Sequence, residues 1–198
     1  MKSIKGIALI VALMIFALPK YSLGASIRSE IYANTDDIRI DLGWVFPAYD
    51  SYPEAGLGLD YSDDYLIANI NFALKDDVLF PGLILGLGLK GLVGQVDVGA
   101  KEFDLGAAAF QVLGEYDLRE KSTNLPITIS ASFSIAPEAL CFSDSSRYRE
   151  FFSALYVYII QNGAIGIGYR NFEARFDDPS GQVKASDDSL FIGFRLHF

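Results

Sequence analysis

The sequence has very few of the residues that build metal centres and disulfides. Its 198 residues include one cysteine, Cys141, and one histidine, His197. A single cysteine excludes an intramolecular disulfide, and together the two counts exclude the usual cysteine-based and multi-histidine zinc sites. No cofactor of any kind is indicated.

Positive charge is also scarce. Lysine and arginine total 16 against 25 acidic residues, which gives a formal net charge of −9. Nucleic-acid binding needs a basic surface, so nucleic acid is excluded as a partner. The apolar fraction is instead high, at 51%. A chain this apolar is not disordered, and the location of its apolar residues becomes the main question.

The longest apolar run lies at the N-terminus. Lys2 and Lys5 precede the apolar run at 7–18, and the small residues Ser22 and Gly24 follow it. This order is typical of a secretory signal peptide that is cleaved after Gly24. The run of about 12 residues is shorter than the roughly 20 that a membrane-spanning helix needs, although a retained anchor helix is an alternative. We therefore predict a signal peptide at 1–24 and one domain at 25–198.

The remaining chain alternates between apolar and polar residues. Ile38, Ile40 and Leu42, for example, are separated by Arg39 and Asp41. A period of two predicts β-strands. The clearest predicted strands are 38–44, 65–72, 83–90, 127–135, 165–170 and 190–198, and weaker ones are 27–33, 55–61, 103–116 and 151–160. The last segment is apolar on both faces, so a short buried helix is its alternative. The pattern predicts an all-β fold of about ten antiparallel strands, with eight as the alternative count.

Alternation alone does not say which face of the sheet meets water. The polar faces carry small residues and isolated charges, whereas a soluble barrel would expose many long lysines and glutamates. Strands of eight to ten residues also match the roughly 9–11 that cross a bilayer at a tilt, and in lipid the sheet must close. We predict a transmembrane β-barrel with a narrow, polar, glycine-lined interior. The expected lumen charges are Arg39, Asp41, Lys90, Arg170 and Arg195.

Aromatic residues near the strand ends favour the same fold. Membrane barrels carry aromatic girdles at both interfaces. The residues that we expect in such girdles are Trp44, Tyr61, Phe172, Phe176, Phe194 and Phe198.

The last strand resembles the C-terminal assembly signal of bacterial outer-membrane barrels. Gly193, Leu196 and the terminal Phe198 match its pattern of a glycine, alternate hydrophobic residues and a final aromatic residue, while Phe191 departs from it. The resemblance implies insertion by the barrel-assembly machinery into the outer membrane of a Gram-negative bacterium.

Several motifs together resemble the YfaZ family of small outer-membrane proteins. They are Ala136–Leu140 followed by Phe142 and Ser143, the strand Ile165–Arg170, and the terminal strand Leu190–Phe198. The resemblance spans most of the chain after residue 24 and is sharpest in the C-terminal half. It implies an outer-membrane barrel, but it brings no established activity and transfers no functional residue.

Pairs of aspartates punctuate the predicted strands. With an even strand number both termini face the periplasm, so the segments 34–37, 62–64, 138–150 and 177–188 face outward. Carboxylates prefer hard cations, which makes the outward pairs candidates for divalent cations that bridge to lipopolysaccharide phosphates. Solvated turn residues are the alternative. The candidates are Asp36, Asp37, Asp63, Asp64, Asp177, Asp178, Asp187 and Asp188.

Function is the least determined property. His197 lies at the predicted periplasmic end, so no Ser-His-Asp set can form at the outer rim. A barrel of about ten strands is nearly filled by its own side chains. We expect a monomeric structural or surface-exposed protein without enzymatic activity. Its partners are outer-membrane lipid, lipopolysaccharide and the assembly machinery. A narrow channel or carrier for small or hydrophobic molecules is the alternative, and the role of Cys141 is open.

Overall fold

The computed structural model describes residues 25–46, 48, 51–78, 80–120, 125–179 and 181–198, so the predicted signal peptide lies outside the described residues. Within them no helix is long and apolar enough to cross a membrane. The elements are β1 (Ser26–Ala33), β2 (Asp37–Val45), β3 (Tyr52–Ser62), β4 (Tyr65–Asp77), β5 (Leu83–Val98), β6 (Lys101–Asp117), η1 (Leu118–Glu120), β7 (Ile127–Ala136), η2 (Glu138–Leu140), β8 (Cys141–Ser143), β9 (Ser145–Ile160), β10 (Gly163–Asp178) and β11 (Gly181–His197).

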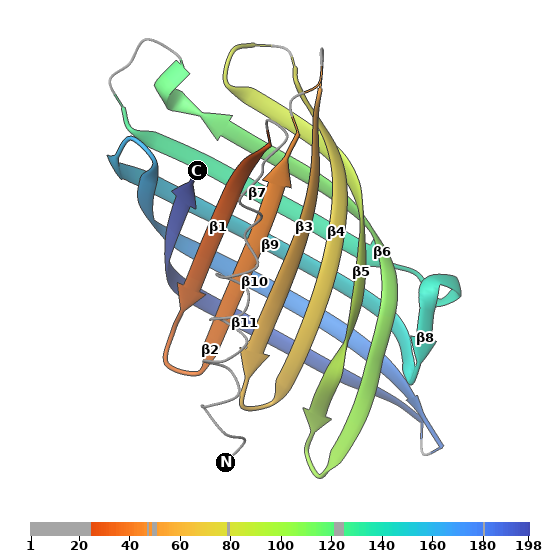
Figure 1. The fold of residues 1–198 in the computed structure, drawn as a ribbon. Helices are drawn as coiled ribbons and strands as arrows, with labels where there is room; N and C mark the ends of the chain where they lie inside the picture. The colour runs from red at the N-terminus through yellow and green to blue at the C-terminus, as the bar shows by residue number, and fades with distance from the viewer. Residues whose placement is uncertain (1–24, 47, 49–50, 79, 121–124, 180) are drawn as a thin grey trace.

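The strands form a closed antiparallel barrel of ten strands (Figure 1). Each long strand pairs with the next along the chain, and β1 pairs with β11 to close the ring, with Tyr32 opposite Gly193. The predicted all-β barrel of about ten strands is confirmed, and the alternative count of eight is wrong. The segment 151–160 is part of β9 rather than a helix.

The short strand β8 continues the path of β7 along β6. Residues 110–117 of β6 pair with β7, and Leu105–Ala107 pair with β8. Between the two segments stands Pro137, which cannot donate a ladder hydrogen bond, and residues 138–140 form η2 instead. Eleven strand segments therefore make ten barrel strands.

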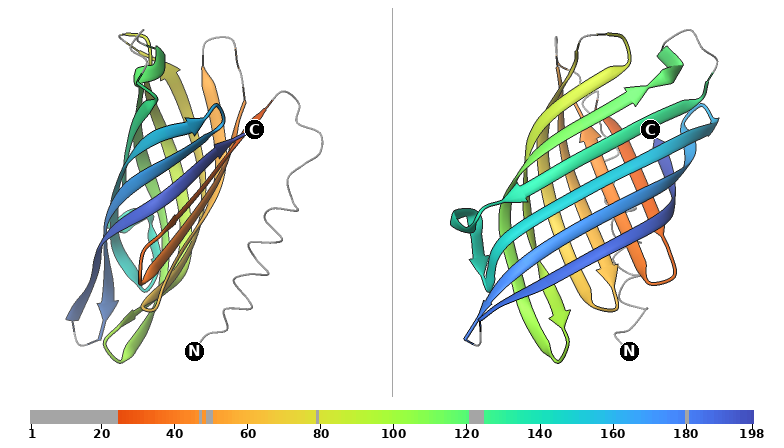
Figure 2. Two further views of the ribbon diagram at one scale, coloured as in Figure 1. Left: turned by 90° about the vertical axis from the view of Figure 1, so that its left-hand side faces the viewer. Right: turned by 180° about the vertical axis from the view of Figure 1, so that it is seen from behind.

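The two ends of the barrel differ (Figures 1 and 2). We call the end that holds Ser26 and Phe198 the terminal end. The opposite end, which we call the distal end, holds short turns at 34–36, 63–64 and 99–100. There the β5–β6 and β10–β11 hairpins extend beyond the ends of β1–β4 (Figure 2). This stagger brings strands from opposite sides of the barrel together at the distal end.

The exterior of the barrel is apolar. On β4, Leu66, Ile70 and Leu74 point outward and are exposed, while Ile67 between them is buried. The outward run Leu66–Leu74 has nine residues, within the roughly 9–11 that a transmembrane strand needs. Side chains as exposed as Leu87 (70%) and Ile192 (71%) suit contact with lipid rather than water. We call this surface the apolar belt.

Two of the predicted girdle residues point inward instead. Phe172 and Phe176 are 1% and 0% exposed, so their assignment to an interface girdle is wrong. Both lie an even number of residues from Arg170 on β10 and therefore share its inward direction. Proximity to a strand end misled the prediction, because the alternation within the strand decides the direction of each side chain.

Gly193 is required by a close approach at the seam between β1 and β11. A Cβ atom on this glycine would lie 2.1 Å from Cδ1 of Tyr32, whose ring covers the position. We expect Gly193→Ala to lower the free energy of unfolding by about 1–3 kcal/mol, because the buried ring has to move. Equilibrium urea unfolding in detergent micelles measures this.

Gly114→Ala is the matched control for that substitution. Its Cβ would meet Leu85 at 3.5 Å, an ordinary contact, so its stability should stay unchanged or rise by up to about 1 kcal/mol. Equal losses for the two variants would mean that the Tyr32 contact is not the cause.

Candidate functional site: the barrel interior

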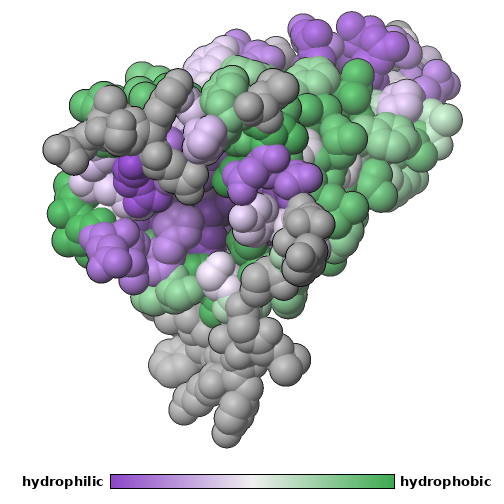
Figure 3. Space-filling view, turned by 90° about the horizontal axis from the view of Figure 1, so that it is seen from above, coloured by the Kyte–Doolittle hydropathy of each residue, from purple (hydrophilic) through white to green (hydrophobic). Residues whose placement is uncertain are grey.

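The interior of the barrel is its chemically distinctive part. Seen from the terminal end, hydrophilic residues line a hollow that is surrounded by a largely hydrophobic wall (Figure 3). Side chains from nearly every strand meet inside and form two charged clusters and two apolar clusters, the larger of which lies in the distal half.

The first group, which we call the central charge cluster, is built around Glu150 of β9. This carboxylate is 3% exposed. Arg39 donates to it through Nη1 at 2.6 Å and Arg170 through Nε at 3.1 Å. Lys90 Nζ and the Tyr148 hydroxyl, the latter at 2.7 Å, donate to its other oxygen. One buried carboxylate thus joins three cations that come from β2, β5 and β10.

Two aspartates complete the central charge cluster. Asp41 accepts from Arg39 Nε at 2.7 Å. Asp60 lies 3.4 Å from Arg39 Nη1 and 3.6 Å from Arg170 Nη2. Three cations and three anions therefore balance inside the barrel, as buried charges require. Its members are Arg39, Asp41, Asp60, Lys90, Glu150 and Arg170.

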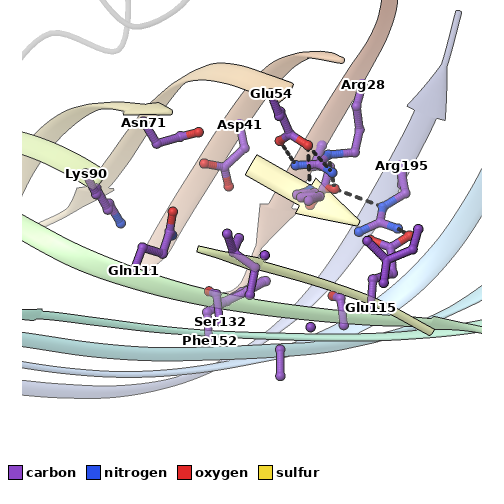
Figure 4. A pocket seen from close by; sticks show the side chains of 18 of the residues that line it. Arg28, Asp41, Glu54, Asn71, Lys90, Gln111, Glu115, Ser132, Phe152 and Arg195 are labelled. Carbon is purple, nitrogen blue, oxygen red and sulfur yellow. Dashed lines mark hydrogen bonds and ion pairs between the residues drawn. The ribbon is translucent and has the colours of Figure 1, made fainter. Parts of the chain in front are cut away.

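A second cluster lies nearer the terminal end, and we call it the terminal charge cluster (Figure 4). Glu30 lies 2.8 Å from Arg195 Nε and 3.0 Å from Arg28 Nε. Glu54 pairs with Arg28 and also with Lys75, whose Nζ is 2.5 Å away. The cluster has three cations and three anions, namely Arg28, Lys75, Arg195, Glu30, Glu54 and Glu115.

A cavity of about 90 Å³ lies between the two clusters. Asn69, Asn71 and Gln111 line it together with members of both clusters. Neither side-chain amide atom of Asn69 has a hydrogen-bond partner among the described residues. The space is large enough for several water molecules, which would satisfy such groups.

The distal half of the interior is apolar. Phe103 and Phe176 stack with their ring centroids 5.0 Å apart, and Tyr65 meets Phe172 edge-on at 5.4 Å. These rings belong to a buried core that also contains Ile67, Leu92, Val96, Leu105 and Tyr148. The expectation of a polar, glycine-lined interior is therefore wrong for this half. The distal stagger brings opposite walls close enough for aromatic side chains to fill the space.

A second hollow, of about 290 Å³, opens at the distal end beside Tyr65 and Phe172. It shares no lining residue with the cavity between the charge clusters. Tyr65 borders this hollow and also accepts a hydrogen bond from Arg170 Nη1 at 3.0 Å. Among the described residues, the central charge cluster and the apolar core thus separate the two spaces.

The structure places the five expected lumen charges inside the barrel. Arg39, Asp41, Lys90 and Arg170 belong to the central charge cluster, and Arg195 belongs to the terminal charge cluster. Sequence reasoning missed the other anions of the two clusters, which are Glu30, Glu54, Asp60, Glu115 and Glu150. For Glu150 a signal was available, because Tyr148, Glu150 and Phe152 share one strand face. The signal was missed because 138–150 was expected to be a loop. This expectation is wrong for its second half, since β9 begins at Ser145.

The aspartate pairs occupy different positions from those expected. Asp187 and Asp188 lie within β11, and Asp177 and Asp178 end β10, so the outward loop at 177–188 is wrong. The backbone of a long hairpin pairs through this region instead. Of the other candidates, Asp37 begins β2, and Asp36, Asp63 and Asp64 lie in short turns.

Several carboxylates of these pairs have protein partners. Asp37 accepts from Ser189 Oγ at 2.5 Å, and Asp188 accepts from Tyr169 and Asn171, both at 2.7 Å. Among the described residues, no three His, Cys, Asp or Glu side chains group closely enough to hold a metal ion.

The remaining residues that the sequence singled out are three at the C-terminus and Cys141 on β8. Phe198 pairs with Ile27 through two backbone hydrogen bonds of 2.9 and 3.0 Å, which secures the C-terminus to β1. His197 Nε2 lies 3.4 Å from the Tyr158 hydroxyl, and Leu196 is partly buried. Cys141 on β8 has a free thiol, and partial burial raises its pKa above the usual value.

Comparisons with known proteins do not place the chain in a family. No family model matches the sequence, and no curated protein sequence matches it. The chain is similar in structure to outer-membrane expressed OmpT of Vibrio cholerae, with 11% identity and a TM-score of 0.39 over 86% of this chain. It is also similar to a mutant of Rh. blastica porin, with 10% identity and a TM-score of 0.19 over 89% of this chain and 99% of the porin. The match covers 64% of the OmpT chain, which is less than two thirds. The protein has a closed antiparallel β-barrel fold of ten strands.

Proposed function

We propose that this protein is a small barrel of the Gram-negative outer membrane whose lumen is closed by its own side chains. One observation carries the proposal. The central charge cluster and the distal apolar core lie between the two hollows, which share no lining residue among the described residues. A barrel closed in this way has a structural or surface-exposed role rather than that of a general diffusion porin. The proposal includes no enzymatic activity.

The proposed setting follows from the chain's architecture. Ser26, the first residue of β1, and Phe198 lie at one end, which we place in the periplasm, so the distal hairpins face outward. Assembly by the barrel-assembly machinery is proposed from Gly193, Leu196 and Phe198, and relationship to the YfaZ family from the motif at 136–140. We propose a monomer surrounded by outer-membrane lipid and lipopolysaccharide.

A narrow channel or carrier is the second candidate. The cavity between the charge clusters favours it, because it is polar and large enough for water. Transport would require the ion pairs of Glu150 to open. Since buried pairs are costly to separate, such opening would be rare without a ligand or voltage.

Planar-bilayer recording of the refolded protein tests the two candidates. We expect no stepwise conductance, because the two hollows share no lining residue among the described residues and the central charge cluster lies between them. A general porin recorded under the same conditions is the positive control, and heat-dependent migration in gel electrophoresis confirms that the barrel is folded. Reproducible unitary steps from the folded protein would overturn the closed-lumen proposal and favour the channel.

A further inference from the structure

Basic side chains gather on the outer surface of the barrel at its distal end. Arg147, Arg175 and Lys184 lie side by side across β9, β10 and β11. In the next row toward the terminal end, Arg149 lies opposite Glu173. These side chains share the outward direction of the apolar belt. We call Arg147, Arg149, Arg175 and Lys184 the basic patch.

Three of the four cations of the basic patch share one ion-pair partner. Glu173 pairs with Arg149 at 2.6 Å, with Lys184 at 2.9 Å and with Arg175 at 3.2 Å. A single carboxylate therefore serves three of the four cations. The basic side chains remain 40–54% exposed where they pair with it, whereas Glu173 is only 5% exposed. Four adjacent basic side chains stand out in a chain whose formal charge is −9.

The position of the basic patch relative to the apolar belt indicates the ligand. Phe151 and Tyr169, which are 38% and 39% exposed, mark the distal edge of the belt on β9 and β10. Arg149 follows two residues beyond Phe151, which is about 7 Å along the strand. Basic side chains just past an apolar surface lie at the depth of lipid headgroups.

We propose that the basic patch binds the phosphate groups of lipid A in the outer leaflet. Arginine suits this role because its planar guanidinium donates two parallel hydrogen bonds to a phosphate. The inference rests on the proposed orientation, with the distal end outward. In this proposal the phosphates contact the basic side chains directly, instead of through divalent cations held by aspartate pairs, and they compete with Glu173 for those side chains.

Binding of defined lipids to the full-length mature protein in detergent tests the proposal. The probes are bisphosphoryl lipid A, monophosphoryl lipid A and phosphatidylglycerol, with affinity measured by native mass spectrometry or fluorescence titration. We expect bisphosphoryl lipid A to bind most tightly, also in the presence of EDTA, and the affinity to fall as salt rises. The triple substitution R147Q, R149Q and R175Q should lower the affinity about 100-fold, at about fivefold for each lost charge.

Two further variants make the result specific. Arg119→Gln removes one exposed charge at the terminal end and should change the affinity less than twofold. Glu173→Gln removes the competing carboxylate and should raise the affinity about fivefold, an effect that misfolding cannot imitate. If the triple variant does not fold, Lys184→Gln and Glu173→Gln carry the test through their opposite signs.

Three results would overturn the proposal. They are unchanged affinity in the folded triple variant, phosphatidylglycerol binding as tightly as bisphosphoryl lipid A, and binding that disappears with EDTA. Binding that disappears with EDTA would instead favour the aspartates as ligands of a bridging divalent cation. None of these results depends on conductance, so failure here is distinguishable from failure of the closed-lumen proposal.

Discussion

Glu150→Gln is expected to lower the free energy of unfolding by about 3–5 kcal/mol. Glu150 compensates Arg39, Lys90 and Arg170 in a site where the carboxylate is 3% exposed. The glutamine keeps the shape but removes the negative charge, so three cations face only Asp41 and Asp60. An uncompensated buried charge costs far more than an exposed one, because no water reaches it.

Urea unfolding of the purified barrel in detergent measures this effect. Glu138→Gln is the matched control, since Glu138 lies exposed on η2, and it should change stability by less than about 0.5 kcal/mol. Combining Glu150→Gln with Lys90→Met removes one unpaired cation and should recover part of the loss. A Glu150 variant as stable as the control would mean that solvent already enters the central charge cluster.

Phe176→Ala is expected to cost about 3–5 kcal/mol as well. Phe176 is fully buried inside the barrel and stacks on Phe103. Truncation removes the transfer free energy of the ring and leaves a cavity where the distal walls meet. The same unfolding assay applies, and truncation should also make the distal backbone amides exchange faster.

The control for that truncation is Phe110→Ala. Phe110 has the same side chain but points outward from β6 and is 55% exposed, so it loses only contacts with detergent or lipid. A small effect at Phe176, equal to that at Phe110, would indicate a water-filled distal lumen and contradict the apolar core.

A large loss of unfolding free energy in both Glu150→Gln and Phe176→Ala would also explain why the lumen is closed. The central charge cluster holds β2, β3, β5, β9 and β10 together through ion pairs, and the distal core holds opposite walls together by packing. An open pore needs both to give way. The same contacts that stabilise the barrel would therefore oppose conduction.

The sequence predicted the barrel class and the strand face on which each side chain lies, because both follow from the local alternation of apolar and polar residues. In Ile38–Trp44 and Leu66–Phe72, the period of two fixes which side chains share a face, and the small polar face excludes a soluble exterior. The same rule predicted that Arg39, Lys90 and Arg170 all point into the barrel interior.

Tertiary structure alone decided which of those charges meet and what fills the space between them. Glu150 pairs with Lys90, 60 positions away, only because the stagger of the strands brings β5 and β9 to one level. The stagger also presses Phe103 against Phe176 and leaves Arg147, Arg175 and Lys184 in a single row beyond the apolar belt. Alternation specifies the side of a strand on which a residue lies, but not its height in the barrel. Height depends on register, which is set by hydrogen bonds between strands distant in sequence.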